Sequence, residues 1–163
     1  MEKINQDDVD WKDYENGESE FRRKELSNSV ESEKLGCSLY ELPPGKQSWP
    51  YHYHTANEEA IFVLEGEGQL RAEGGKHSLE KGDFVTLPAN SSGGHTVFND
   101  SDRKIRYLMV STMNEPDVTV YPKMEKLGIF VGDPPGGRSE DGRDLHGFYK
   151  IDDDVSYWGE DGD

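Results

Sequence analysis

The chain has 163 residues and a mass of 18.5 kDa, the size of one domain with flanking segments. Its one cysteine, Cys37, excludes an internal disulfide, and no apolar run approaches the roughly 20 residues of a membrane span. The net charge of −16 opposes binding to nucleic-acid phosphates. Since the first residues also lack a signal peptide, the sequence predicts a cytoplasmic protein with neither a nucleic-acid nor a membrane partner.

The negative charge is concentrated at the two ends of the chain. Residues 1–20 carry a net charge of −6 and residues 140–163 carry −7, which leaves −3 for everything between them. Acidic ends of this kind favour solubility more than recognition of a partner. We therefore expect an acidic N-terminal arm at residues 1–19, one domain at residues 20–131 and an acidic C-terminal arm at residues 132–163.

Short runs of β-branched and aromatic residues recur along the chain, separated by turn residues. They predict strands at 21–26, 35–42, 48–54, 60–65, 69–73, 76–79, 83–87, 94–99, 103–111, 117–121 and 128–131. The adjacent Gly74 and Gly75 indicate a hairpin turn, because glycine adopts positive φ without steric cost. No long stretch has the 3.6-residue apolar period of a helix. The pattern predicts an all-β antiparallel sandwich or small barrel.

Three of the five histidines stand at positions that suit a metal site. His52 and His54 lie two residues apart in an extended segment, so both imidazoles point to one face. Glu58 and Glu59 follow after a short turn, and His95 opens a later strand. Imidazoles with a carboxylate form a good donor set for a divalent transition metal. For the His52–His54 pair taken by itself, the alternative to metal binding is that both residues are ordinary surface or core histidines.

The order of these residues resembles the two consensus motifs of the cupin family. The first motif begins at Gly45, continues after six residues with His52-x-His54 and after four more with Glu59, and ends after another six at Gly66. The second motif begins at Gly82, continues after five residues with Pro88 and then with His95, and ends after three more residues at Asn99. The first has one residue more than the family pattern between Gly45 and His52. The second has Asn90 where the family has glycine, and its loop is two residues longer. The resemblance covers about residues 35–112.

The resemblance implies a fold and a metal site. The fold is a double-stranded β-helix, or jelly-roll barrel, here with irregular N- and C-terminal arms. The ligands carried over are His52, His54, Glu59 and His95, with Glu58 as the alternative to Glu59. They would hold one divalent ion of iron, manganese, nickel, copper or zinc, and the ion would keep positions open for water and substrate.

For function, the resemblance implies a small single-domain, metal-binding cupin of the type 2 conserved-barrel kind. We expect a metal-dependent enzyme of the dioxygenase, isomerase or lyase type, acting on a small organic substrate coordinated in the barrel. The alternative is a non-catalytic cupin that binds a small molecule, because a fold does not fix a function. A homodimer is expected from the resemblance, and the outward apolar residues Phe62 and Leu64 would suit it.

Aromatic residues near the histidine pair and in the C-terminal arm have other expected roles. Strand alternation predicts that Trp49 packs in an outer layer or on a dimer surface, opposite His52 and His54. The C-terminal arm is expected to fold over the barrel mouth, with Tyr149, Tyr157 and Trp158 as anchors, or to pack on a dimer partner.

Overall fold

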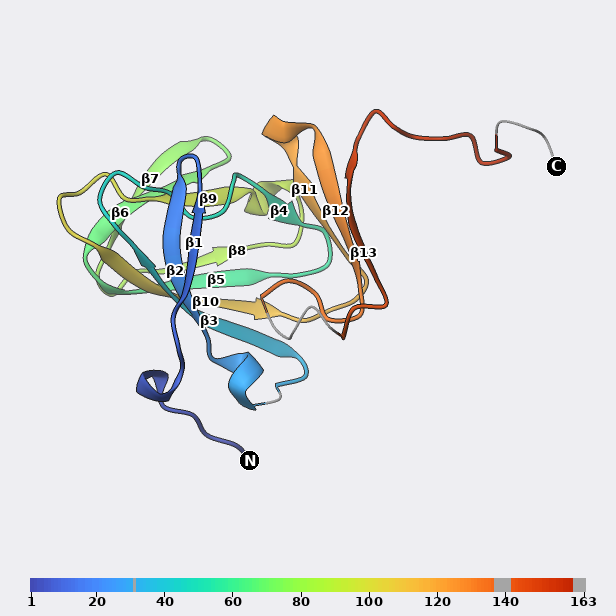
Figure 1. Cartoon of the computed structure of the whole chain (residues 1–163). Coiled ribbons are helices and arrows are strands. Elements are labelled where there is room, and N and C mark those ends of the chain that lie inside the picture. The colour runs from blue at the N-terminus through green and yellow to red at the C-terminus, as the bar shows by residue number, and fades with distance from the viewer. Residues whose placement is uncertain (31, 137–141, 160–163) are drawn as a thin grey trace.

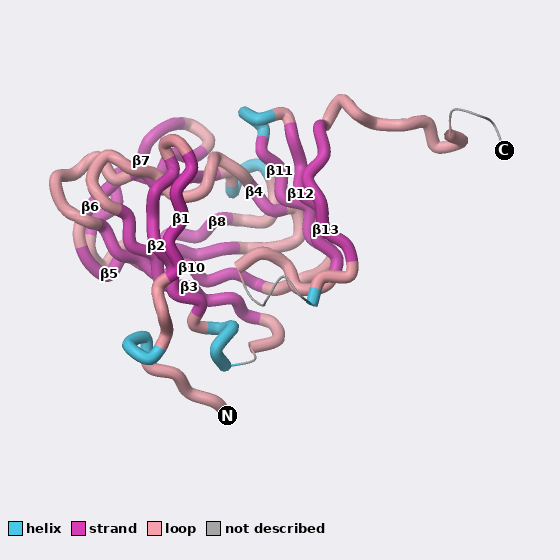
Figure 2. Tube along the Cα trace, viewed as in Figure 1, coloured by secondary structure: helices cyan, strands magenta, loops and turns pink. Residues whose placement is uncertain are grey.

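Strands dominate the structure, a computed structural model that describes residues 1–30, 32–136 and 142–159 (Figure 2). The strands within these ranges are β1 (Lys12–Asn16), β2 (Ser19–Glu25), β3 (Leu35–Leu42), β4 (Tyr53–His54), β5 (Glu59–Glu65), β6 (Glu67–Ala72), β7 (Gly75–Glu80), β8 (Phe84–Leu87), β9 (His95–Phe98), β10 (Ile105–Thr112), β11 (Asp117–Tyr121), β12 (Lys126–Val131) and β13 (Leu145–Lys150). The helical elements are the short 3-10 turns η1 (Gln6–Asp8), η2 (Ser27–Val30), η3 (Ser91–Gly93) and η4 (Pro122–Met124). The predicted all-β class is confirmed.

The strands form three antiparallel sheets. The largest has the order β1-β2-β3-β10-β5-β8, the second β13-β12-β11-β4 and the third β7-β6-β9. In Figure 1, β11, β12 and β13 stand together at one side of the barrel. The non-consecutive neighbours β3, β10 and β5 bring segments far apart in the sequence side by side, as a jelly roll requires.

The core lies between the six-stranded and the three-stranded sheets. β5 shows how it forms: Ile61 and Val63 are fully buried, whereas Phe62 between them is 40% exposed. This two-residue alternation places one face of the strand inside. The other members of the buried cluster are Phe21, Tyr40, Leu42, Leu70, Leu79, Leu87, Val97, Ile105 and Tyr107. Burying each aliphatic side chain contributes about 1.5–3 kcal/mol.

Two turns need glycine for different reasons. Gly66, between β5 and β6, has φ +81, and a Cβ there would lie 2.4 Å from the carbonyl oxygen of Lys104. Gly82, between β7 and β8, has φ +99 but open space around it. Both turns therefore require a backbone conformation that glycine adopts freely, and only the first also lacks room for a side chain.

Both expected arms contribute a strand to a sheet. β1 pairs with β2 at the edge of the six-stranded sheet, and β13 pairs with β12 at the edge of the four-stranded sheet. Residues 137–141 and 160–163 of the expected C-terminal arm lie outside the described residues. The boundaries at residues 19 and 131 stay predictions. None of the helical turns in the described ranges is long and apolar enough to cross a membrane.

Candidate metal centre

The His52–His54 pair lies in a segment that is only partly a regular strand. Within the predicted strand 48–54, β4 comprises Tyr53 and His54, which pair with β11. His52 forms an isolated antiparallel bridge with His95. Pro50 interrupts the segment because it has no backbone N–H to donate. The imidazole rings of His52 and His54 still face the same region, with centroids 5.3 Å apart.

Glu59 joins this pair from the first position of β5. Its side chain is on the inward face that Ile61 and Val63 share, and the residue is 8% exposed. Oxygen Oε2 of Glu59 lies 3.7 Å from Nε2 of His54. The ligand atoms of His52, His54 and Glu59 all lie within 4.8 Å of one another. Glu58, the alternative to Glu59, is exposed, whereas Glu59 is buried.

His95 reaches the cluster from β9, after the longer loop noted in the sequence. Its Nε2 lies 3.6 Å from Oε2 of Glu59, and its ring centroid is 4.9 Å from that of His52. The loop closes as the 3-10 turn η3, which Asn90 caps by accepting a hydrogen bond from the N–H of Ser92 at 2.8 Å. The extra residues are therefore absorbed in a compact turn, and His95 stays beside its expected partners.

Each imidazole has its Nδ1 engaged by an oxygen that accepts a hydrogen bond. The acceptors are the carbonyl of Pro50 for His52 at 2.7 Å, the carboxylate of Asp117 for His54 at 2.6 Å and the carbonyl of Gly93 for His95 at 3.0 Å. Because these oxygens only accept, Nδ1 of each ring carries the proton. The lone pair then resides on Nε2. This arrangement is the one that orients histidines as metal ligands.

Asp117 is a functional residue that the sequence did not single out. It is fully buried, and its carboxylate accepts hydrogen bonds from His54, from the N–H of Ala56 at 3.1 Å and from the hydroxyl of Thr119 at 3.4 Å. One signal could have found it: Asp117 and Thr119 alternate with Val118 and Val120 in β11, so two polar side chains occupy the inward face.

Burial and neighbouring charges together determine the pKa values of the three histidines. Burial lowers the pKa of His52 well below its usual value, and His95 and His54 add to this effect. Burial also lowers the pKa of His95. Burial alone would lower the pKa of His54, but the charges of Glu59 and Asp117 and the hydrogen bond to Asp117 outweigh it and raise the pKa. His52 and His95 are therefore neutral near pH 7, the form in which imidazole binds a metal.

The cluster fits a transition metal by the chemistry of its donors. The ligand atoms of His52, His54 and Glu59 form one buried group, and Nε2 of the buried His95 lies 3.6 Å from Oε2 of Glu59. Nitrogen and oxygen donors of this kind suit manganese, iron, nickel, copper and zinc.

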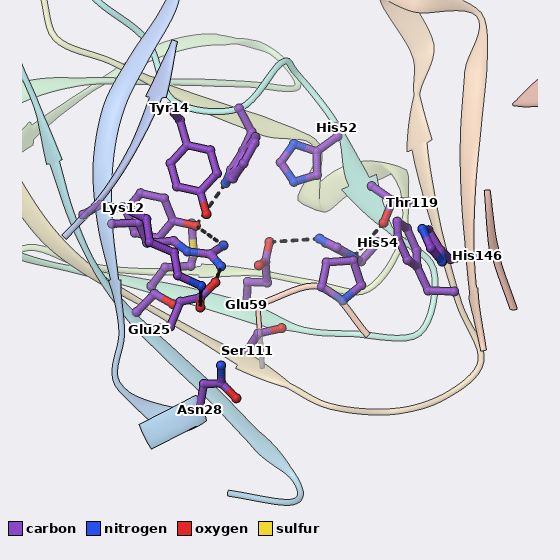
Figure 3. Close-up of a pocket in the computed structure, with 18 of the residues that line it drawn as sticks. Lys12, Tyr14, Glu25, Asn28, His52, His54, Glu59, Ser111, Thr119 and His146 are labelled. Atoms are coloured by element: carbon purple, nitrogen blue, oxygen red, sulfur yellow. Dashed lines mark hydrogen bonds and ion pairs between the residues drawn. The ribbon is translucent and has the colours of Figure 1, made fainter. Parts of the chain in front are cut away.

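A cavity of about 390 Å³ adjoins the cluster. His52, His54 and Glu59 line it, and its walls come from the six-stranded sheet on one side and from β11, β12 and β13 on the other. Figure 3 shows Glu59 between Lys12 and Glu25 at one end and His54 and Thr119 at the other. The volume suits a small organic molecule.

Trp49, Tyr157 and Trp158 depart from their expected places. Trp49 lines the cavity and donates a hydrogen bond to the hydroxyl of Tyr40 at 3.0 Å, so the outer-layer prediction is wrong for this residue. Strand alternation does not apply across the interruption at Pro50. In the C-terminal arm, β13 brings His146 to the cavity. Tyr157 and Trp158 are 90% and 75% exposed, and therefore do not anchor the arm to the barrel.

Comparison with known proteins identifies the domain. The sequence model of the cupin domain, in its type 2 form, matches residues 38–111. Quercetin 2,3-dioxygenase of Bacillus subtilis (strain 168) is 30% identical over 69 residues, which are 42% of this chain and 20% of that enzyme. The chain thus matches about a fifth of that relative's length.

Two solved structures extend the similarity to most of the chain. A protein of Acidithiobacillus ferrooxidans, whose name assigns it to the sugar phosphate isomerases, is 27% identical with a TM-score of 0.70, over 85% of this chain and 81% of its own. A cupin-superfamily sugar phosphate isomerase of Silicibacter pomeroyi is 22% identical with a TM-score of 0.76, over 97% and 99%. The second likeness confirms the jelly-roll fold.

Proposed function

Since residues 38–111 form a cupin domain of the type 2 form, we propose that the protein is a metal-dependent enzyme acting on a small organic substrate. His52, His54, Glu59 and His95 hold one divalent transition metal ion. The observation that carries the proposal is the convergence of His52, His54 and Glu59 at the wall of a cavity of about 390 Å³, with His95 beside Glu59. The ion would supply Lewis-acid or redox chemistry to a substrate in this cavity.

The chain's own residues orient the site and limit access of water. The hydrogen bonds at each Nδ1 fix the imidazoles. Tyr121 covers His52, with ring centroids 5.6 Å apart and an interplanar angle of 24°. Burial, with the nearby charges of Asp117 and Glu59, raises the pKa of Tyr121 to about 12. Its hydroxyl therefore stays protonated and can donate a hydrogen bond to a bound substrate.

Two of the similar proteins suggest different reaction classes for this chain. The Acidithiobacillus ferrooxidans protein, named as a sugar phosphate isomerase, matches 85% of the chain. The Bacillus subtilis dioxygenase matches 42% of it. The longer match favours an isomerase, and the identity of the metal discriminates between the classes. Zinc, nickel or manganese would direct assays to isomerase or lyase chemistry, and iron or copper to reactions with dioxygen.

The test is elemental analysis of the full chain purified without added metal, followed by titration of the metal-free protein. We expect about one equivalent of a transition metal per chain. The double variant His52→Ala/His54→Ala should lose the metal and keep the β-rich circular dichroism spectrum. His77→Ala, which removes an exposed histidine outside the cavity, is the matched control and should retain the metal. A wild-type protein that takes up no metal would refute the proposal and favour a non-catalytic binding barrel.

We also propose that the protein is a cytoplasmic homodimer with no nucleic-acid partner. Phe62 and Phe84 support the dimer, because they face each other across β5 and β8 and are 40% and 65% exposed. Exposed aromatic pairs of this kind favour association. Light scattering of the wild type and of Phe84→Ser tests it: we expect a dimer that the substitution weakens. A monomeric wild type would contradict this part of the proposal.

A further inference from the structure

Aromatic side chains make up much of the cavity wall. Among the described residues, six of them line it: Tyr14, Tyr40, Trp49, Tyr121, Phe130 and Phe148. Met109 adds a thioether to the same lining. Aromatic rings and methionine sulfur attract another aromatic ring beyond the effect of burying its area. The lining therefore favours a ligand that contains an aromatic ring.

The rings form two groups that belong to different walls of the cavity. Tyr14 of β1 meets Trp49 edge to face, with ring centroids 5.0 Å apart and an interplanar angle of 69°. On the wall formed by β11, β12 and β13, Phe148 meets Tyr121 and Phe130 edge to face, with centroids 6.1 Å and 6.0 Å apart. These rings are held by one another before a ligand arrives, which lowers the entropy cost of binding.

The cations that line the cavity already have partners within the protein. Lys12 Nζ lies 2.5 Å from Oε2 of Glu25, and the guanidinium of Arg23 contacts the other oxygen, Oε1. Arg143 donates a hydrogen bond from Nε to the carbonyl oxygen of Asp133 at 3.0 Å. These groups therefore do not require an ionic ligand.

Ser38 supplies an independent observation in the same lining. It lies in β3, two residues before Tyr40, and both residues are buried on the face of the strand that lines the cavity. The hydroxyl of Ser38 has no hydrogen-bond partner among the described residues, although buried hydroxyl groups nearly always have one. Since a hydroxyl can donate or accept, Ser38 can bind a hydroxyl or carbonyl oxygen of a ligand beside Tyr40.

We propose that the substrate is a neutral aromatic compound, whose planar ring lies between the two groups of aromatic side chains and whose oxygen substituent binds the hydroxyl of Ser38. The inference rests on the proposed function, because it names the class of substrate for the same cavity. A volume of about 390 Å³ has room for a two-ring compound. In Figure 3, Tyr14 and Thr119, which belong to the two walls, lie on opposite sides of Glu59.

The experiment is calorimetric titration of the metal-free full chain with 2-naphthol and, separately, with its saturated analogue decahydro-2-naphthol. Both probes have the same carbon skeleton and one hydroxyl, but only 2-naphthol is planar and aromatic. Metal-free protein is used because a bound metal would itself attract the oxygen of either probe. We expect 2-naphthol to bind saturably and about two- to tenfold more tightly than the analogue, the usual advantage of an aromatic pair. Equal or tighter binding of the analogue, or no saturable binding of 2-naphthol, would overturn the proposal.

Phe148→Leu tests the contribution of the rings. It removes an aromatic side chain from the lining and should weaken 2-naphthol about two- to tenfold, with little change for the saturated analogue. Tyr149→Leu is the matched control, because Tyr149 is the next residue of the same edge strand, is similarly exposed and lies outside the cavity. Equal weakening of 2-naphthol by the two variants would count against the aromatic site.

Ser38→Ala tests the contact to oxygen. It should weaken 2-naphthol about two- to tenfold, as expected for loss of one neutral hydrogen bond. Naphthalene has no oxygen, so its affinity should be the same for Ser38→Ala and the wild type. An equal change for both probes would refute the role of Ser38. Circular dichroism shows whether each variant is folded.

The metal titration of the same protein separates this inference from the proposed function. If the wild type binds 2-naphthol as expected but takes up no metal, the proposed enzyme function fails and the aromatic site stands. If the wild type takes up a metal but does not bind 2-naphthol, the inference fails and the metal site stands.

Discussion

Replacing Asp117 by asparagine tests how the buried carboxylate sets the metal affinity of His54. In the wild type, burial acts to raise the pKa of Asp117, but the hydrogen bond and charge of His54 outweigh it and lower the pKa, so the side chain is a carboxylate. It can only accept, and it keeps the proton of His54 on Nδ1. Asparagine has nearly the same shape, but it has no charge and can present an NH2 group instead. His54 would then hold its proton on Nε2, where it blocks a metal.

The structure gives the size of the effect. The Nδ1 to Oδ2 distance of 2.6 Å is that of a charge-assisted hydrogen bond, and such bonds contribute about 1.5–3 kcal/mol. Loss of a partner that orients a metal ligand lowers metal affinity roughly 10- to 100-fold, which corresponds to about 1.4–2.7 kcal/mol. The two estimates agree, so Asp117→Asn should weaken metal binding by one to two orders of magnitude.

The assay is competition with a chelator of known affinity, using zinc(II) and the metal-free full chain at constant pH. Glu58→Gln is the control, because it removes one carboxylate next to Glu59 from an exposed position. Circular dichroism confirms that both variants are folded. Dissociation constants for Asp117→Asn and Glu58→Gln that agree within about twofold would refute the reasoning, since the effect would then be general charge and not orientation of His54.

Two further predictions concern stability. In metal-free protein the pKa of His52 is lowered by folding, so below about pH 6.5 the unfolded chain binds a proton that the folded chain does not. The free energy of unfolding therefore decreases as the pH falls, by up to about 1.4 kcal/mol per pH unit. Urea unfolding at several pH values should show a shallower decrease for His52→Gln than for the wild type or the exposed-site control His77→Gln; equal slopes would contradict this. Gly66→Ala and Gly82→Ala should each lower the free energy of unfolding by about 1–2 kcal/mol through backbone strain. Gly66→Ala should lower it more, because the added Cβ would meet the carbonyl of Lys104. A larger loss of stability for Gly82→Ala than for Gly66→Ala would be inconsistent with the structure.

Local sequence determined most of the strands. β5 could be predicted because Ile61 and Val63 alternate with less buried residues, and its ends coincide with turn residues such as Gly66. β1 and β13 were not predicted. They are edge strands with mostly exposed side chains, so they lack the apolar alternation that marks a strand from sequence alone. Hydrogen bonds to β2 and β12 specify them instead.

The sequence by itself also determined that His52, His54, Glu59 and His95 are candidates for one site, because their spacing follows strand alternation and a family pattern. Only the tertiary structure decided what surrounds them. Asp117 contacts His54 across 63 positions of the chain, because β11 pairs with β4. The cavity residues Lys12 and Arg23 likewise come from β1 and β2, in a different sheet from β4. Pairing between distant strands leaves no local periodic signal, so sequence can predict the ligands but not the groups that orient and face them.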